Sequence, residues 1–391
     1  MTERLVRRFI RDWEKVNDPE VRERYGVLSG GVGIFLNLLL SLGKFFAGLL
    51  TGSISVTADA FNNLSDAGSS VVTLVGFKLA GQKADDGHPF GHGRIEYLAG
   101  LLVSLLILMV GVELGKSSIE KIFHPEPVEF SLLTVIILAA AILVKLWMCL
   151  FNRNLGRRIG SAAMEATAAD SLSDVVATSA VLVGTLVGGL TEVNIDGWIG
   201  VVVAVFILRA GWGAAKDTVD PLLGSAPDPT LVKEIQQVVL AHKQVVGMHD
   251  LVIHDYGPGR QMCSFHAEVP QNADIMDAHD AIDHIEREIY QKFGIETTVH
   301  MDPIATEDEE VNRLREQVKM LVKELDPDMS THDFRVTRGP QFTNLIFDVV
   351  VPYRCKLSDE EVVRRIKEKV GELGPNYFAV LQLDRAYTTS E

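Results

Sequence analysis

Residues 55–70 read SVTADAFNNLSDAGSS and residues 165–179 read EATAADSLSDVVATS. Each stretch lies inside a long apolar segment and carries a polar pair at i, i+4 spacing, which puts both members on one helix face. The pairs are Asn62 with Asp66, and Asp170 with Asp174. Placing three carboxylates at a bilayer centre costs roughly 8–10 kcal/mol, at roughly 2.5–3.5 kcal/mol each. The pattern therefore predicts polar sites inside membrane-spanning helices, where a cation meets the carboxylates.

Six long apolar stretches precede residue 217, each longer than the roughly 20 residues that cross a bilayer core. They run over residues 27–50, 54–80, 95–118, 131–152, 162–190 and 194–215. The second and fifth are rich in Ala, Ser, Thr, Asn and Asp, so we expect them to be the inner helices of an all-α bundle. Lys and Arg gather before the first stretch and in the 2–3 and 4–5 loops. This bias predicts a multi-pass protein of the cell membrane with both termini in the cytoplasm.

The composition indicates a membrane half joined to an acidic soluble half. The 391 residues are 47 % hydrophobic, yet the net charge is −15. Three scattered cysteines without a CxxC pattern argue against a disulfide framework or a Cys-based zinc site. We expect an amphipathic cytoplasmic segment over 1–26, a six-span domain over 27–217, an α+β domain over 218–305 and a second, degenerate copy of that domain over 306–391.

The duplication is predicted from the order of elements. Residues 231–304 read as helix–strand–strand–helix–strand, and residues 309–391 repeat that order. HDFRVTRGPQFTNLIFDVVVP in the second copy parallels HDLVIHDYGPGRQMCSFHAEVP in the first. Where the first copy has His266, His279 and His300, the second copy has Asp348, Glu361 and Gln382. We therefore expect the second copy to be structural or dimerising, or to bind metal differently.

The intramembrane quartet offers one amide oxygen and three carboxylates. This all-oxygen set suits Mn²⁺, Mg²⁺ or Ca²⁺, whereas Zn²⁺ normally takes His or Cys ligands. Asp59 lies one turn before Asn62 and is a candidate supporting or entry group. The competing interpretation is that these residues cap a helix break or bond one helix to another.

Two further clusters have metal-ligating residues. Asp85, His88 and His92 lie in the Gly- and Pro-rich stretch KADDGHPFGHGRIEY, whose compact turn would bring them to one ion. The alternative is a solvated loop that caps the next helix. The first α+β copy carries a second set, whose alternative is a group of ordinary surface histidines. That set is His249, His266, His279, His300 and Asp302.

Motifs of other protein classes are missing from the sequence. It has no Walker motif, no nucleophile elbow and no HExxH, so we expect neither enzyme activity nor an organic cofactor. We also expect no nucleic-acid partner.

The polar motifs resemble those of the cation diffusion facilitator family. DAFNNLSD, DDGHPFGHGRIEYLAGL, ADSLSD and the tail HDL…GP…H…H…HMDP occur in family order over about residues 25–305. The resemblance implies a proton-coupled exporter of divalent metal with a cytoplasmic ferredoxin-like domain. It also implies a homodimer formed through the transmembrane and C-terminal domains.

The resemblance assigns Asn62, Asp66, Asp170 and Asp174 to the transport site and the two other clusters to a loop site and a cytoplasmic-domain site. Arg94 matches a position that forms a charge interlock between protomers in the family. Zinc-transporting members usually place a histidine in the quartet, whereas this chain has Asn62 and Asp170. It thus looks like the manganese-transporting branch, with Zn²⁺, Fe²⁺ and Co²⁺ as other candidate ions.

Four alternatives stay open at this point. The nearest is a zinc or iron exporter of the same family. A passive divalent-cation channel and a metal-sensing or storage protein belong to different classes. A membrane metallohydrolase is the fourth, although no nucleophile or general base accompanies the metal ligands.

Overall fold

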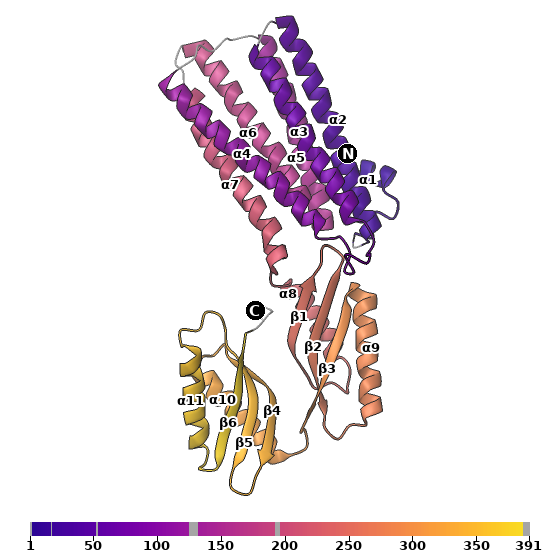
Figure 1. Cartoon of the computed structure of the whole chain (residues 1–391), viewed down its shortest axis with the longest axis vertical. Coiled ribbons are helices and arrows are strands. Elements are labelled where there is room, and N and C mark those ends of the chain that lie inside the picture. The colour runs from indigo at the N-terminus through magenta and orange to yellow at the C-terminus, as the bar shows by residue number, and fades with distance from the viewer. Residues whose placement is uncertain (1, 17, 52–53, 125–131, 192–195, 386–391) are drawn as a thin grey trace. The chain divides into compact units, whose positions relative to one another are not determined.

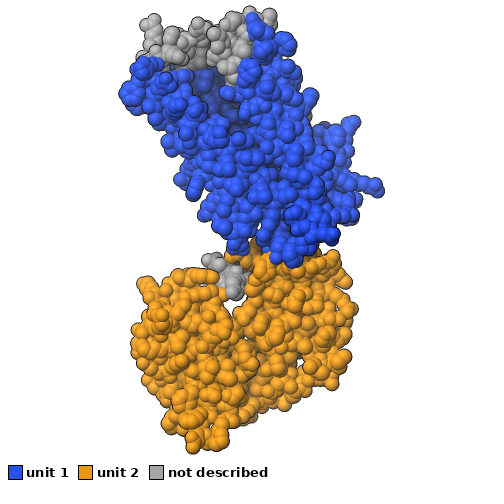
Figure 2. All heavy atoms as spheres, in the orientation of Figure 1, with its two compact units in different colours: residues 1–225, 255–260 blue, residues 226–254, 261–391 orange. Residues whose placement is uncertain are grey.

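The computed structural model describes residues 2–16, 18–51, 54–124, 132–191 and 196–385. It forms two compact units (Figure 2). Unit 1 comprises residues 1–225 and 255–260, and unit 2 comprises residues 226–254 and 261–391.

Unit 1 is built from helices (Figure 1). They are α1 (Thr2–Phe9), α2 (Pro19–Thr51), α3 (Ile54–Ala80), α4 (Ile95–Phe123), α5 (Leu132–Ile159), α6 (Ala162–Thr191) and α7 (Asp196–Leu223). The most extensive contacts pair α2 with α3, α4 with α7, and α5 with α6. Helix α2 begins at Pro19, earlier than the predicted residue 27. The Asp18 carboxylate accepts a hydrogen bond from Glu20 N at 2.8 Å, and a proline suits the first helical position.

Within the described residues, five helices are long and apolar enough to cross a membrane. These segments are Pro19–Phe46, Ile95–Phe123, Val135–Ile159, Ala162–Val183 and Gly197–Leu223. Helix α3 has 27 residues but is not among the five. Its run of Asn, Ser and Asp residues lowers its hydropathy, in keeping with an inner position in the bundle.

Small residues let α2 and α3 approach closely. A Cβ atom added at Gly30 would lie 2.6 Å from the Leu74 Cβ and 2.9 Å from the Ser70 carbonyl oxygen. A Cβ added at Gly43, on the same helix, would meet nothing within 4 Å. Gly30 is therefore a packing requirement, whereas Gly43 is not.

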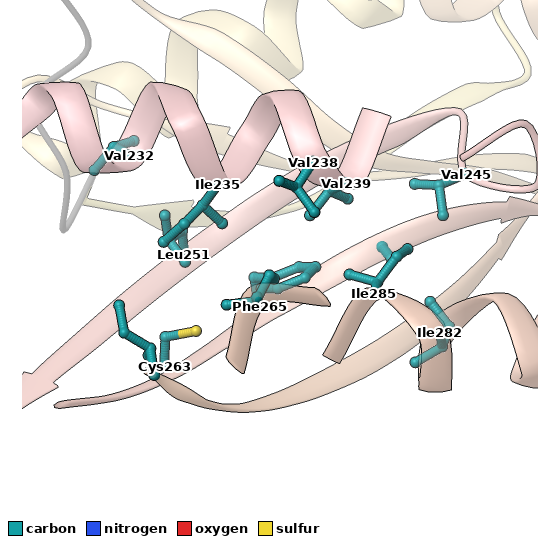
Figure 3. Close-up of a cluster of buried hydrophobic side chains, with 13 residues drawn as sticks. Val232, Ile235, Val238, Val239, Val245, Leu251, Cys263, Phe265, Ile282 and Ile285 are labelled. Atoms are coloured by element: carbon teal, nitrogen blue, oxygen red, sulfur yellow. The ribbon is translucent and has the colours of Figure 1, made fainter. Parts of the chain in front are cut away.

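The first half of unit 2 is an α+β layer structure. Its elements are α8 (Pro229–Leu240), β1 (Gly247–Asp255), β2 (Gln261–Pro270), α9 (Ile275–Phe293) and β3 (Glu296–Ile304). The sheet has the order β1-β2-β3, with β2 and β3 parallel. Figure 3 shows its core, in which Ile235 of α8 and Ile285 of α9 are fully buried with Phe265 of β2. Aspartates cap both helices, with Asp228 accepting from Thr230 N and Asp274 from Met276 N.

The second half of unit 2 has the same order of elements. They are α10 (Glu309–Leu325), β4 (Ser330–Arg338), β5 (Thr343–Val350), α11 (Asp359–Glu372) and β6 (Tyr377–Asp384). Its sheet has the order β4-β5-β6, again with a parallel final pair. It has its own core, which includes Val318, Phe347 and Ile366. Each half therefore buries its apolar residues in a separate cluster.

Candidate metal centres

A buried cluster of charges joins α3, α5 and α6 in unit 1. The Lys145 Nζ of α5 lies 2.7 Å from Asp66 Oδ2 and 2.5 Å from Asp174 Oδ2. The Lys145 side chain is only 6 % exposed. One ammonium group thus satisfies one carboxylate from each of the two polar helices.

Lys145 is not among the site residues predicted from the sequence. The sequence feature that could have revealed it is the presence of one lysine in the middle of an apolar segment, LLTVIILAAAILVKLWMCL. A charge buried there needs a partner of opposite charge. The pattern does not say which face of the helix the lysine occupies, and so it does not name the partners.

The other predicted ligands of the quartet lie on the same two helices. Asp170 is half-buried one turn before Asp174, and its carboxylate bonds to the Ser69 side chain of α3. Asn62 lies on α3 one turn before Asp66, and its side chain is exposed. The side chain of Asp59 lies outside what the structure describes. The cluster thus unites Asp66 and Asp174 directly and leaves Asn62 at its margin.

The predicted loop site is brought together in the α3–α4 connection. Asp85 Oδ1 lies 3.4 Å from His88 Nδ1, and Asp85 Oδ2 lies 3.5 Å from His92 Nε2. Hydrogen bonds from the backbone N–H groups of His88 and Gly87 lower the pKa of Asp85. Within the described residues, the buried His92 Nδ1 has no hydrogen-bond partner. These three side chains have the donor atoms and proximity to hold one divalent ion.

Arg94 contacts the turn between β1 and β2, whose residues belong to unit 1. Its Nη2 donates to the Asp255 carbonyl oxygen at 2.6 Å, and its guanidinium lies 4.8 Å from the Tyr256 ring centroid. The Tyr97 hydroxyl donates to the Asp255 carboxylate at 2.9 Å. Within one chain, Arg94 therefore has partners of its own; the interlock between protomers stays a prediction.

Four of the five predicted ligands of the cytoplasmic-domain site converge in unit 2. Asp302 Oδ2 lies 2.8 Å from His266 Nδ1 and 3.2 Å from His249 Nε2. Asp302 Oδ1 lies 3.2 Å from His300 Nε2. The parallel pairing of β2 with β3 sets His266 opposite His300 and so builds the cluster. His279 is not part of it and is exposed on α9, because Ala278, Ala281 and Ile282 form the buried face of that helix.

The His249 ring lies between the carboxylates of Asp250 and Asp302. Its Nδ1 lies 3.3 Å from Asp250 Oδ2, which fixes the ring. In the tautomer whose Nδ1–H donates to Asp250, Nε2 would present a lone pair toward Asp302, an arrangement that a bound cation would stabilise. Within the described chain, Nε2 has no hydrogen-bond partner. Contacts with the His249 and His332 rings hold the pKa of Asp250 well below its usual range.

A second cluster in unit 2 lies outside the predicted site. Its members His332, Asp348 and Asp384 come from β4, β5 and the end of β6. Burial opposes a charge on His332, but the carboxylates of Asp250, Asp348 and Asp384 outweigh it and raise the pKa of that ring. Burial, and then the neighbouring Asp384, raise the pKa of Asp348. The sequence gives no local signal for this set, because its members are remote along the chain.

Long apolar helices with charged side chains buried between them define an integral membrane protein. Comparison with known families makes the class specific. Residues 32–223 match the cation efflux transmembrane domain, and residues 227–304 match the cytoplasmic domain of cation efflux proteins. The chain belongs to the cation efflux family of membrane transporters, the cation diffusion facilitators, which confirms the predicted family.

Several relatives share most of their length with the chain. An uncharacterized transporter of Methanocaldococcus jannaschii is 31 % identical over 244 residues, which cover 62 % of this chain and 86 % of that protein. The cation-efflux pump FieF of Cronobacter sakazakii is 30 % identical over 266 residues, covering 68 % of this chain and 88 % of the pump. The same figures hold for FieF of Escherichia coli K12.

Proposed function

We propose that this protein exports divalent metal cations from the cytoplasm in exchange for protons, with Mn²⁺ as the favoured ion. One observation carries the proposal: two carboxylates from α3 and α6 converge on a single buried cation, the Lys145 ammonium. A site that already accommodates one positive charge between apolar helices has the electrostatics that a metal ion needs. The kinship with pumps named for cation efflux supports the same function.

The ion preference follows from the oxygen-only donor set. Asp66, Asp170 and Asp174 supply carboxylates and Asn62 an amide, and hard oxygen ligands favour Mn²⁺ over Zn²⁺. Asn62 is exposed in this conformation, so it completes the site when α3 rotates toward the cluster during the cycle.

In the transport cycle, the Lys145 ammonium competes with the metal ion for the same carboxylates. An arriving metal ion displaces the ammonium from Asp66 and Asp174, and the lysine returns when the ion leaves. Protons that bind to the carboxylates on the far side weaken metal binding and complete the exchange. Rocking of α3 and α6 against their neighbours exposes the site to one side and then the other.

The membrane topology of the proposal has six spans, because α3 crosses beside the five apolar helices. Both termini lie in the cytoplasm, as the basic loops predict. The cytoplasmic domain pairs two chains into a homodimer, and the second half of unit 2 is a degenerate copy of the first. The loop cluster of Asp85, His88 and His92 takes up metal on the cytoplasmic side.

Flux into proteoliposomes tests the function. Asp66→Asn and Asp174→Asn should abolish Mn²⁺ transport, while Ser65→Ala, an exposed residue on the same helix as Asp66, should leave it unchanged. Wild-type flux in both aspartate variants would refute the proposed site. Flux that does not depend on a pH gradient would refute proton coupling and favour a channel.

Ion selectivity needs its own measurement. Flux of Mn²⁺, Zn²⁺, Fe²⁺ and Co²⁺ is compared between wild type and Asn62→His. An added imidazole should shift the preference toward Zn²⁺. An unchanged preference would place selectivity outside the quartet, and a wild type that prefers Zn²⁺ or Fe²⁺ would make the protein an exporter of those ions.

A further inference from the structure

We infer that the second half of unit 2 holds a metal site of its own, formed by His332, Asp348 and Asp384 with Asp250 from the first half. Its occupant is a divalent cation that prefers oxygen ligands, with Mn²⁺ as the test ion. The site is a resident one, separate from the path through the membrane. The existence of this site can therefore be tested independently of the transport function.

The backbone correspondence between the halves points to the site. His249 and His332 each precede an aspartate with a positive φ, 52° at Asp250 and 51° at Asp333. Such a conformation is uncommon outside glycine, so its recurrence after both histidines marks equivalent positions. The strand pairing extends the match, since His266 pairs with His300 in one sheet and Asp348 with Gln382 in the other.

The donor atoms lie close enough together for one ion. One ligand atom from each of His332, Asp348 and Asp384 lies within 4.8 Å of the others. At metal–oxygen distances of about 2.1–2.4 Å, opposite ligands of one ion are up to about 4.8 Å apart. Asp250 adds a fourth donor, because its Oδ2 lies 3.3 Å from His332 Nε2.

The His332 ring is an independent sign of a missing ligand. Its side chain is 8 % exposed, and Nε2 faces Asp250 at 3.3 Å and Asp384 at 3.5 Å. These two contacts are ion pairs, and within the described residues this buried nitrogen has no partner that meets the criteria of a hydrogen bond. Buried polar atoms are rarely left without one, and a metal ion would supply it.

The donor groups of this site differ from those of the predicted metal site in the first half of unit 2. The first half offers three imidazoles and one carboxylate, a set that suits Zn²⁺. The proposed site offers the His332 imidazole and three carboxylates, of which Asp250 comes from the first half, and such a set suits harder ions. A cavity of about 420 Å³ is lined from both halves and gives an ion access. Its polar lining includes Asp250, His266, His300, Asp348, Gln382 and Asp384.

Equilibrium dialysis of the purified full-length protein against Mn²⁺ tests the site, with bound metal counted by mass spectrometry. Asp348→Asn with Asp384→Asn should lose one Mn²⁺ per chain relative to wild type. Asp328→Asn with Asp359→Asn, two exposed carboxylates of the same unit, should lose none. Unchanged stoichiometry and affinity in the first variant would overturn the inference and leave His332 as part of a metal-free ion-pair network.

A converting variant tests the site by exchanging ligands. Asp348→His with Gln382→His recreates the donor set of the first half. It should tighten Zn²⁺ binding at least about tenfold and weaken Mn²⁺ binding at the same site. An unaltered Zn²⁺ affinity would contradict the inference, and because the readout is binding, neither result depends on transport.

Discussion

At the scale of single residues, Lys145 changes the meaning of the intramembrane aspartates. Two carboxylates between apolar helices are costly, and a partner ammonium offsets that cost only while it stays in contact. The 2.5 Å and 2.7 Å contacts show such a pairing. The ammonium therefore balances one of the two negative charges from within the chain, and at the proposed transport site a metal ion would compete with it for the carboxylates.

Substituting Lys145 should separate its contribution to stability from its competition with a metal ion. Lys145→Gln removes the ammonium that pairs with both Asp66 and Asp174, and removing one partner of a buried pair costs about 3–5 kcal/mol. We expect a lower melting temperature in metal-free detergent solution and its recovery in saturating Mn²⁺. We also expect a lower KM for Mn²⁺ flux, because the competitor is gone.

Lys78→Gln is the matched control, since Lys78 lies exposed on α3. It should change neither the melting temperature nor KM. A Lys145→Gln protein that melts like wild type without metal, or ignores Mn²⁺, would show that the ammonium does not hold the carboxylates.

The predictability of the site varies from residue to residue. The pairs Asn62–Asp66 and Asp170–Asp174 stand out in the sequence, because local spacing alone puts each pair on one helix face. Lys145 does not, because contact between helices depends on their rotation. His279 is a different case, since the apolar spacing of Ala278, Ala281 and Ile282 already turns it outward.

At the scale of elements, close helix packing depends on individual glycines. Gly30 lets α2 lie against the backbone and side chains of α3, which carries Asp66. Helix α3 is too polar to be positioned by hydropathy, so its contacts with neighbouring helices fix its place. The packing of α2 on α3 thus positions one wall of the candidate transport site.

Alanine substitutions at Gly30 and Gly43 of α2 should therefore have different effects on the stability of the protein. Gly30→Ala introduces a Cβ at 2.6 Å from Leu74 and should destabilise the protein by about 1–3 kcal/mol, as overpacking does. Gly43→Ala meets nothing and should be neutral or stabilising by up to about 1 kcal/mol, because alanine favours helix. Thermal melting of both variants in detergent measures the difference. Equal melting temperatures would contradict the close approach of the two helices.

At the scale of the whole molecule, the matched family domains end at residue 304, while unit 2 continues to the second α+β half. The order of elements in both halves follows from the sequence pattern. The contact of Asp250 with His332 does not, because it depends on how two separately folded halves dock. The cluster of His332, Asp348 and Asp384 was not predicted for another reason, since its members are remote along the chain and meet only through the pairing of β4, β5 and β6.

Deleting residues 306–391 tests how independent the halves are. The first half has its own buried cluster around Phe265, so we expect the shortened chain to insert and transport Mn²⁺ like wild type. Dialysis should show the loss of the metal equivalent assigned to His332, Asp348 and Asp384. Loss of flux in a monodisperse, folded preparation would instead make the second half essential for transport.

The ammonium of Lys145 also has an electrical consequence. It lies in the middle of α5 and adds one positive charge to the proposed transport site, which would face first one side of the membrane and then the other during the proposed cycle. Moving one elementary charge through a membrane potential of 100 mV involves about 2.3 kcal/mol. In the proposed cycle, we therefore expect the lysine to offset one of the negative charges that move with the empty carrier. We expect the return step to be less sensitive to voltage than it would be with the three carboxylates alone.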